Sequence, residues 1–440
     1  MVFSVVVAGK GIDALSLFPL DRVLAKRVRA GRLAVIDPGG MRHDFGDPLA
    51  DPDVVIRLHS PRVLWDLARH PSLQLGEAYV DGGLTIERGT LRDLLRIALV
   101  SQDQAIRESR FYGVLRKLGT LYHAKAATNL IGHAERNVRH HYDIGQAFYR
   151  LLLDRDMQYS CGYWRESTKS LDQAQTEKKR HIARKLLLKP GMEVLEIGSG
   201  WGGLALQLAR EHDVNVTGLT LSRDQYETSV RRAEDAGLQD KVRFKLLDYR
   251  LVDGSYDRIV SVGMFEHVGR PSFGKFFGQV HRLLKDDGIA LIHTIAKMWD
   301  PGPTNPWIRT YIFPGGHIPT LSELAPVVER SGLWLTDMEN LRLHYAFTLN
   351  AWNERFQQHR AQVSRMFDER FCRMWEFYLQ GCEAGFRYQE LCVFQMQLAK
   401  TIAAVPITRD YLYTGSPAFV QNENSDNVLQ LRSTDTRRRR

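Results

Sequence analysis

Cysteine is scarce in this chain, with four cysteines in 440 residues. So low a content excludes a disulfide framework and favours a reducing compartment. Cys372, Cys382 and Cys392 recur at a spacing of ten residues, which does not place them on one face of a helix. No pair has the C-x-x-C spacing of a zinc site, so the sequence predicts no metal site.

Long hydrophobic runs are also missing. No apolar stretch approaches the roughly 18 residues that a membrane-spanning helix needs. The beginning, MVFSVVVAGK, has no basic residue ahead of its apolar stretch and no convincing cleavage site, so a signal peptide is not expected. We therefore expect a cytoplasmic protein that contacts a membrane only peripherally, at its inner face.

Positive charge is in excess, with a formal net charge of +9. Such a balance fits an anionic partner, either nucleic acid or a phospholipid surface. Residues 416–440 are polar, aperiodic and end in TDTRRRR, which predicts a flexible basic tail. A hydrophobic fraction of 44% indicates a globular protein, and 440 residues indicate two units plus tails.

Residues 1–120 are expected to form the first unit. LAVIDPGGMRHDFG is typical of two strands joined by a Pro-Gly-Gly turn, and VVIRLHS is typical of another strand. Helical spacing follows over 60–86 and 89–103, and residues 101–135 have the composition of a polar, basic helical connector. We expect a small α+β module without an obvious catalytic motif.

Residues 121–415 are expected to form the second unit. An amphipathic helix precedes Pro190 and Gly191, and from residue 192 apolar strands alternate with helices. That alternation predicts a doubly wound parallel α/β sheet, in which ligands bind beyond the carboxyl ends of the strands. The first such end is VLEIGSGWGG, residues 194–203.

The glycine-rich turn at this strand end suits a small polar ligand. Gly198, Gly200 and Gly202 allow close approach of the backbone, although nicotinamide and flavin proteins use related loops. A P-loop is excluded because no Gly-Lys-Ser/Thr follows. Glu196, on the preceding strand, would repel a pyrophosphate and suits an ammonium group. The turn therefore resembles the first motif of class I S-adenosylmethionine methyltransferases.

Further motifs narrow this resemblance. In chain order they are HYDIGQAFYRLLLD, MQYSCGYW, EIGSGWGG, GLTLSRDQ, DYR, FEHVG, HTI, YIFPGG, HYAFTLNAW and FYLQGCEAGFR. This ordered set resembles the cyclopropane-fatty-acyl-phospholipid synthase family, which includes the mycolic acid cyclopropane synthases, over about residues 128–400. The resemblance implies a Rossmann-like class I methyltransferase with helical lipid-binding insertions.

The resemblance also implies a reaction on unsaturated phospholipid acyl chains. A methylene unit from S-adenosylmethionine is added to a cis double bond: methyl transfer leaves a carbocation in the chain, and loss of a proton closes a cyclopropane ring. The family is understood to use a bound bicarbonate ion as the base. Its cradle, carried over to this sequence, consists of Cys161, Glu266, His293, the Ile295 backbone and Tyr345. His293 and Tyr345 would donate to the anion, and Glu266 would accept its hydroxyl proton.

The same resemblance implies the cofactor contacts. The acid that usually holds the ribose after the second strand is absent, and neutral side chains stand in its place. In order along the cofactor, the contacts are Tyr142, Tyr159, Ser160 and Glu196 at the methionine end, Gly198, Gly200 and Trp201 in the loop, Thr220 and Gln225 at the ribose, and Asp248 and Tyr249 at the adenine.

Simple packing is the alternative for several of these residues. Glu266 is also compatible with a helix cap and His293 with a core hydrogen bond, but the joint match of the motifs favours function. Cys161 is interpreted as a contact of the bicarbonate and not as a covalent nucleophile, because an alkene is not an electrophile. Cys382 lies in a stretch sometimes described for the family as catalytic, and we interpret it as a helix-packing cysteine.

The acyl chain requires an apolar channel. Candidate linings lie outside the Rossmann core, in 140–165, 297–320 and 345–395, where FCRMWEFYLQ and FQMQLAK are rich in aromatics and Met, although core packing explains any single residue. Lys and Arg attract anionic lipid at about 1 kcal/mol per residue near the surface. We therefore expect residues 1–120 to dock lipid or to form a homodimer.

Three alternatives to this function remain. The first is the same cofactor and lipid with a methyl-branched, methylene or hydroxylated product, against which the presence of Glu266 argues. The second is a lipid-binding protein that has lost catalysis, against which the complete set of contacts argues. The third is a methyltransferase of small molecules or nucleic acid, in which YSC and HTI would have no role, so no nucleic-acid partner is expected.

Overall fold

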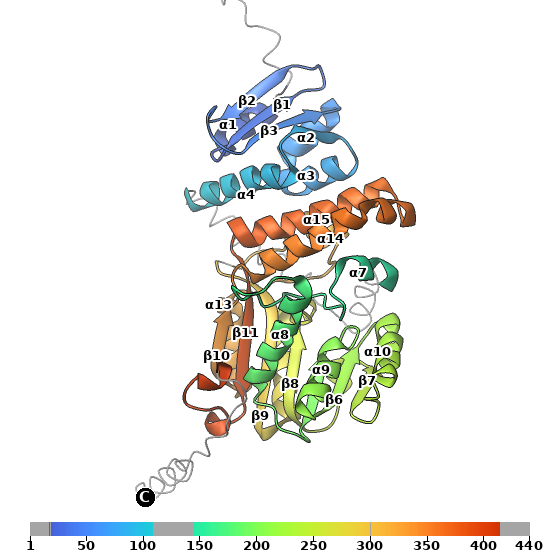
Figure 1. The fold of residues 1–440 in the computed structure, drawn as a ribbon. Helices are drawn as coiled ribbons and strands as arrows, with labels where there is room; N and C mark the ends of the chain where they lie inside the picture. The colour runs from blue at the N-terminus through green and yellow to red at the C-terminus, as the bar shows by residue number, and fades with distance from the viewer. Residues whose placement is uncertain (1–16, 18, 109–143, 300, 414–440) are drawn as a thin grey trace, which may run out of the picture.

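The structure is a computed structural model that describes residues 17, 19–108, 144–299 and 301–413. Tyr142, most of the expected connector and the tail over 416–440 lie outside the described residues. Two units are stacked on either side of a layer of long helices (Figure 1). Among the described helices, none is both long and apolar enough to cross a bilayer.

The first unit is a four-stranded sheet with helices, which agrees with the expected α+β module. Its strand order is β2-β1-β3-β4, with β1 antiparallel to β2 and parallel to β3. The elements are α1 (Leu20–Arg27), β1 (Arg32–Ile36), β2 (Arg42–Gly46), β3 (Asp53–Leu58), α2 (Pro61–Arg69), α3 (Pro71–Val80), β4 (Leu84–Arg88) and α4 (Leu91–Glu108).

Strand β4 corrects the prediction of helical spacing through residue 86. Helix α3 ends at Val80, and Gly82, with a φ of 75°, turns the chain. Residues 84–88 then pair antiparallel with β3, and Leu84 is fully buried. Pairing with a neighbouring strand decides the conformation of this short stretch, and its own pattern does not reveal that neighbour.

The second unit is built on a seven-stranded sheet of the class I methyltransferase type. The order is β10-β11-β9-β8-β5-β6-β7. Strands β5 to β9 pair in parallel, as the doubly wound prediction requires, whereas β11 is antiparallel to both of its neighbours. The strands are β5 (Glu193–Ile197), β6 (Asn215–Thr220), β7 (Val242–Leu246), β8 (Tyr256–Val262), β9 (Leu284–Lys297), β10 (Trp334–Asn340) and β11 (Leu391–Ala399).

Strand β11 corrects the placement of FQMQLAK outside the Rossmann core. This segment is the second strand from one edge of the sheet, between β10 and β9, and its side chains are buried on both faces apart from the last residue. The stretch FQMQL alternates apolar and polar residues as a half-exposed strand does, but Gln395 and Gln397 are buried and hydrogen-bonded to His293 and to the Lys185 carbonyl. Composition alone therefore did not separate it from a channel lining.

Helices cover both faces of this sheet, and several begin at a side-chain cap. Ser170 and Ser222 accept the backbone N–H three residues ahead and so start α8 and α10. Helix α8 ends at Leu186, before Pro190, because Leu187 adopts a left-handed conformation. The helices of this unit are α7 (Gln146–Leu152), α8 (Leu171–Leu186), α9 (Gly203–His212), α10 (Arg223–Asp235), α11 (Phe273–Leu283), α12 (Pro306–Tyr311), α13 (Leu321–Ser331), α14 (His344–Met366) and α15 (Glu369–Tyr388).

Helices α14 and α15 form the layer between the two units (Figure 1). Helices α3 and α4 of the first unit pack against α15. At this junction the Tyr79 hydroxyl donates to Glu376 at 3.0 Å, and Arg92 binds the buried Glu383 at 2.9 Å. Of the two aromatic and Met-rich segments expected to line a channel, FCRMWEFYLQ packs here, in an apolar cluster that also includes Val80, Leu91 and Leu95 of the first unit, whereas the apolar residues of FQMQLAK pack in a cluster of the second unit.

Candidate active site

The turn between β5 and α9 has the backbone that its glycines predict. Gly198, Gly200 and Gly202 have φ values of 86°, 53° and 82°, a region that side chains with a Cβ rarely adopt. A Cβ at Gly198 would lie 2.8 Å from the Cβ of Met264, just after β8, whereas one at Gly200 would meet open space. Gly198 is thus constrained by its neighbour as well as by its own conformation.

A cavity opens at this turn, at the carboxyl ends of the parallel strands. Gln158, Met264 and His267, which were not predicted, form part of its wall. Every predicted cofactor residue within the described part of the chain also lines it, namely Tyr159, Ser160, Glu196, Gly198, Gly200, Trp201, Thr220, Gln225, Asp248 and Tyr249.

Glu196 supplies a buried acid to this cavity. It lies on β5 and is 3% exposed, and burial raises its pKa to about 8. Its Oε2 atom has no hydrogen-bond partner. A buried carboxylate with an open lone pair is costly unless a cation or donor reaches it. The site is therefore suited to a ligand that presents an ammonium group.

Thr220 and Gln225 are joined to each other at the end of β6. The Thr220 hydroxyl donates to Gln225 Oε1 at 2.8 Å and accepts the N–H of Ser222 at 3.1 Å. Both side chains are buried, so their orientation is fixed. The Gln225 amide N–H groups remain as neutral donors at the position where the sequence predicts a ribose contact.

Asp248, which also lines the cavity, is engaged within the protein. Its carboxylate caps the short helical turn η2 (Tyr249–Leu251) and binds the Arg250 guanidinium at 2.8 and 2.6 Å. The Tyr249 ring packs on Phe276, and burial raises its pKa to about 12. Any ligand contact of Asp248 is thus shared with Arg250, which the sequence did not identify.

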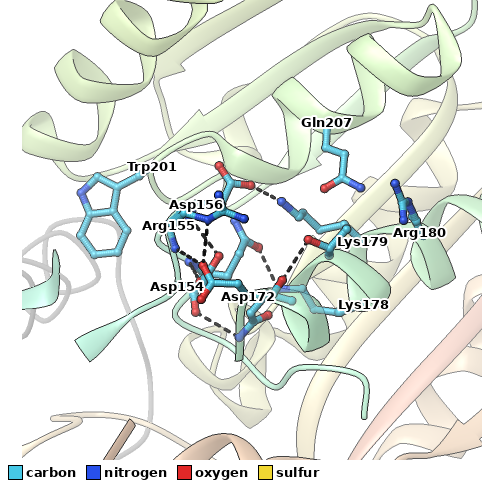
Figure 2. A network of polar contacts seen from close by, with 12 residues as sticks. Asp154, Arg155, Asp156, Asp172, Lys178, Lys179, Arg180, Trp201 and Gln207 are labelled. Atoms are coloured by element: carbon cyan, nitrogen blue, oxygen red, sulfur yellow. Dashed lines mark hydrogen bonds and ion pairs between the residues drawn. The ribbon is translucent and has the colours of Figure 1, made fainter. Parts of the chain in front are cut away.

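The loop over 154–161 is fixed by a network of charged groups (Figure 2). Asp154 accepts the backbone N–H of Gln158 at 2.8 Å and that of Asp156 at 3.0 Å. The Asp156 carboxylate binds both Lys179 of α8 and Arg232 of α10. These bonds hold the loop against two helices, so that Tyr159 and Ser160 lie at the cavity.

An aromatic chain connects the cavity to Tyr345. Tyr159 stacks on Trp352 with ring centroids 5.0 Å apart, and its hydroxyl lies 2.7 Å from that of Tyr378. Tyr345 lies in the first turn of α14, with its ring edge-on to Trp352 at 5.8 Å. In this series of rings, Trp352 lies between the predicted cradle residue Tyr345 and the cavity residue Tyr159.

Glu266 and Ile295 meet as the resemblance implies. Glu266 follows β8 in the turn η3 (Phe265–His267), and its Oε1 accepts the backbone N–H of Ile295 at 2.7 Å. The carboxyl group is buried, which raises its pKa to about 7, and Oε2 has no hydrogen-bond partner. One oxygen of a proton-accepting group is thus fixed and the other remains open.

His293 lies on β9, two residues before Ile295 and on the same face of the strand. Burial lowers its pKa to about 3, so the imidazole is neutral. Its Nδ1 lies 3.1 Å from the side-chain nitrogen of Gln395 on β11, which donates to it and leaves the ring proton on Nε2. The His293 carbonyl accepts the N–H of Gly263, a cavity residue, at 2.9 Å.

The two predicted cysteines are both protonated thiols. Burial raises the pKa of Cys161 well above its usual range, and its Sγ donates to the Gly162 carbonyl at 3.3 Å. Cys382 lies on α15, packs against the same apolar cluster and has a pKa raised to about 12 by burial. Neither environment activates a nucleophile, because a thiolate is stabilised by nearby cations and polar surroundings.

The cradle residues adjoin the cofactor cavity but do not line it. The structure joins Glu266 to Ile295 by a hydrogen bond, and it places Cys161, Ile295 and Tyr345 in one apolar cluster. His293 is connected to these residues by β9, the strand that also carries Ile295. The predicted residues thus form two neighbouring sets, one around the cavity and one beside it.

Sequence reasoning missed Lys178, His267 and Gln395. His267 is partly buried at the cavity, and desolvation lowers its pKa to about 4, whereas Gln395 orients His293. A signal for Lys178 was present, because it follows Leu171 and Ala174 on the apolar face of an amphipathic helix, where a lysine is rarely found. Gln395 gave no such signal, because its strand was not recognised as part of the sheet.

Comparison with known proteins identifies the family. The family model described as mycolic acid cyclopropane synthetase matches residues 131–396. A model described as a domain of unknown function matches residues 25–110. Thus the first unit and the second unit match separate families.

Similar proteins cover most of the chain. A probable fatty acid methyltransferase of Pseudomonas putida is 36% identical over 85% of this chain and 94% of its own. The cyclopropane-fatty-acyl-phospholipid synthase of Escherichia coli (strain K12) is 37% identical over 79% of this chain and 88% of its own. The solved structure of mycolic acid cyclopropane synthase CmaA1 complexed with SAH and CTAB has a TM-score of 0.57, with 34% identity, and covers 60% of this chain and 97% of its own. The chain therefore belongs to the mycolic acid cyclopropane synthetase family and is a class I S-adenosylmethionine-dependent methyltransferase.

Proposed function

We propose that this protein adds a methylene unit from S-adenosylmethionine to the cis double bond of an unsaturated acyl chain in a membrane phospholipid and so forms a cyclopropane ring. Relatives named as cyclopropane synthases support the transfer of a methylene unit to an unsaturated lipid chain. The observation that carries the finer proposal is the open Oε2 of buried Glu266, fixed by Ile295 beside the cofactor cavity.

The residues of the cavity fit the cofactor. The unpartnered Oε2 of Glu196 suits its ammonium group, and the loop around Gly200 leaves space where a side chain would intrude. Thr220 and Gln225 would hold the ribose, and Tyr249 would lie against the adenine. When bound, the cofactor supplies an electrophilic methyl group. The chain's own contribution is to fix that group and to exclude water, which would otherwise capture a cation.

The neighbouring set fits a bicarbonate ion, which supplies the base when bound. Neutral His293 offers the Nε2 proton, and the Tyr345 hydroxyl offers another donor. Glu266, with a pKa raised to about 7 by burial, can accept the hydroxyl hydrogen of the anion and take up its proton. Cys161 and the Ile295 backbone would complete the cradle. Fixed donors beside a developing cation also stabilise the charge as it forms.

The test of this proposal is turnover on vesicles of unsaturated phospholipid. We expect wild-type protein to depend on added bicarbonate and Glu266→Gln to lose about 100- to 10,000-fold in rate, the range for a general base. S-adenosylhomocysteine binding serves as the folding control, and Glu211→Gln, on the exposed face of α9, serves as the matched variant. Equal rates for Glu266→Gln and wild type would remove Glu266 from the proposed proton path.

Action at the inner face of the membrane and lipid docking or homodimer formation by the first unit belong to the same proposal. The net charge of +9 supports attraction to anionic lipid. The first unit rests on α15, which carries part of the apolar cluster, so it is placed to influence the approach of an acyl chain.

A methyl-branched or methylene product is the second candidate. The similarity to a probable fatty acid methyltransferase favours it, because that relative covers more of the chain than the synthase does. A cyclopropane and a methylene branch both add one CH2 to the chain, so mass alone does not separate them. Proton NMR of the extracted lipids does, since ring protons resonate far upfield and vinyl protons far downfield.

A further inference from the structure

Lys178 is a buried lysine beside the cofactor cavity. It lies on the inward face of α8 and has no exposed surface. Its Nζ donates to the Ser160 hydroxyl oxygen at 2.8 Å and to Gln158 Oε1 at 2.7 Å. Both of these acceptors belong to residues that line the cavity. Figure 2 shows Lys178 and Lys179 on α8, beside the loop that carries Asp154 and Asp156.

The surroundings of this ammonium group differ from those of a second buried lysine on the same helix. Lys185 is also fully buried, but it lies 2.6 Å from Glu339 and 3.3 Å from Asp337. The hydrogen bonds that the structure gives Lys178 go to two neutral oxygens instead. Buried charges in proteins are normally paired with an opposite charge.

The acidic residues near Lys178 either bind other groups or face the cavity. Asp154 accepts two backbone N–H groups of its own loop, and Asp156 binds Lys179 and Arg232. Glu196 faces the cavity with an open oxygen. Burial accordingly lowers the pKa of Lys178 to about 8, although Asp154 acts in the opposite direction.

One end of the cofactor carries the kind of negative charge that the hydrogen bonds of Lys178 lack. The amino-acid end of S-adenosylmethionine carries an ammonium and a carboxylate on the same carbon. Glu196 is suited to the ammonium. Because Ser160 accepts from Lys178, its hydroxyl hydrogen is free to point elsewhere, and a donor backed by a cation is suited to a carboxylate.

We propose that Lys178 is a positioning residue that, through Ser160 and Gln158, makes the carboxylate subsite of the cofactor cavity. Gln175, one turn earlier on α8, supports the same loop, because its amide donates to the Ser160 carbonyl at 2.8 Å. The inference depends on the cofactor and is independent of the lipid product or of bicarbonate.

Calorimetric titration of Lys178→Met with three ligands tests it. The ligands are S-adenosylhomocysteine, its decarboxylated form S-adenosyl-3-thiopropylamine, and 5′-methylthioadenosine, which lacks the whole amino-acid end. We expect the variant to lose about 10- to 100-fold in affinity for S-adenosylhomocysteine, the range for a charge-assisted hydrogen bond. Affinity for the other two ligands is expected to change less than about threefold.

Lys185→Met is the matched control, because it removes a buried lysine from the same helix without touching the cavity. It is expected to lower stability and to leave the ratio of the three affinities unchanged. Equal losses for all three ligands in Lys178→Met, or no loss, would overturn the proposal. So would a selective loss in Lys185→Met.

Ser160→Ala keeps the proposal testable if Lys178→Met does not fold. It removes only the hydroxyl through which the lysine acts, so we expect the same selective loss for the carboxylate-bearing ligand. Parallel loss across the three ligands would refute the subsite. Failure of wild-type protein to bind S-adenosylhomocysteine would count against the proposed cofactor itself, which separates the two hypotheses.

Discussion

Glu266 and Glu323 are two buried glutamates whose surroundings shift the pKa in opposite directions. Burial raises the pKa of Glu266 to about 7 from an ordinary 4.5. Burial also acts to raise the pKa of Glu323, but the hydrogen bond and charge of His317, together with Arg270, outweigh it and lower that pKa. Folded Glu266 therefore binds its proton more tightly than the unfolded chain does, and folded Glu323 binds its proton less tightly.

The stability of the two corresponding variants should respond oppositely to pH. Because the Glu266 pKa is raised, its contribution to the free energy of unfolding falls as pH rises from about 4.5 to about 7. Glu266→Gln should remove this loss and be more stable than wild type at pH 8 by on the order of 3 kcal/mol. Glu323→Gln should be less stable at pH 8, with the difference shrinking as pH falls.

Urea unfolding at pH 5 and pH 8 measures the Glu266 effect, and unfolding at about pH 3 and pH 6 measures the Glu323 effect, because a lowered carboxyl pKa changes stability only around and below its ordinary value of 4.5. If the difference in free energy of unfolding between Glu266→Gln and wild type is the same at pH 5 and pH 8, the Glu266 carboxyl group titrates normally in the folded protein. An unchanged difference between Glu323→Gln and wild type from pH 6 to pH 3 would contradict the role of His317 and Arg270 in lowering the Glu323 pKa.

The glycines of the β5–α9 turn offer a matched pair of substitutions. Both Gly198 and Gly200 have positive φ, but only Gly198 faces Met264 at 2.8 Å. Gly200→Ala should cost about 1 kcal/mol for its backbone strain, and Gly198→Ala about 2–4 kcal/mol because overpacking adds to it. Gly198→Ala should also weaken S-adenosylhomocysteine binding more, because displacement of Met264 reshapes the cavity wall. Similar costs for the two would show that the contact relaxes freely.

At the scale of elements, the close packing of α3 against α12 and α15 requires a glycine at position 76, because a larger residue would not fit. A Cβ at Gly76 of α3 would lie 2.5 Å from the Trp307 ring and 2.8 Å from that of Phe377. Gly76→Ala should therefore destabilise by about 1–3 kcal/mol despite the better helix propensity of alanine. Gly381→Ala, in α15 with open space around it, should stabilise by about 0.5–1 kcal/mol. Thermal unfolding of both variants measures the contrast, and stabilisation by Gly76→Ala would contradict the close packing.

The elements differ in how much of them the sequence could predict. Strands β5 to β9 and helices α8 to α11 were predictable because each carries its own apolar pattern, and Ser170 and Ser222 also mark the starts of α8 and α10. Strand β11 was not recognised, because its aromatic and Met-rich composition also fits a channel lining and its neighbours β9 and β10 are distant in the sequence. The cavity residues share short motifs and could be predicted together. The role of Gln395 could not be predicted, because it arises from a contact with His293 on a distant segment of the chain. Lys178 carried a signal in its place on the apolar face of α8, but the pattern did not reveal its partners Ser160 and Gln158.

At the scale of the whole molecule, charge sets the expected partner. With a net charge of +9, binding to anionic vesicles should weaken at least about tenfold between roughly 0.05 and 0.5 M salt, as screening shortens the reach of surface charges. Binding to zwitterionic vesicles of the same acyl composition should be weak and nearly independent of salt. Co-sedimentation measures both. Equal binding to the two kinds of vesicle would show that charge does not direct the protein to lipid.

The antiparallel insertion of β11 between β9 and β10 bears on how the chain is made. A ribosome releases residues 284–297 well before residues 391–399, so one side of β9 lacks its final neighbour while α14 and α15 are still being synthesised. An open apolar edge invites pairing with other nascent chains. Completion of the catalytic sheet, and with it the hydrogen bond from Gln395 that orients His293, therefore waits until residues 391–399 have emerged.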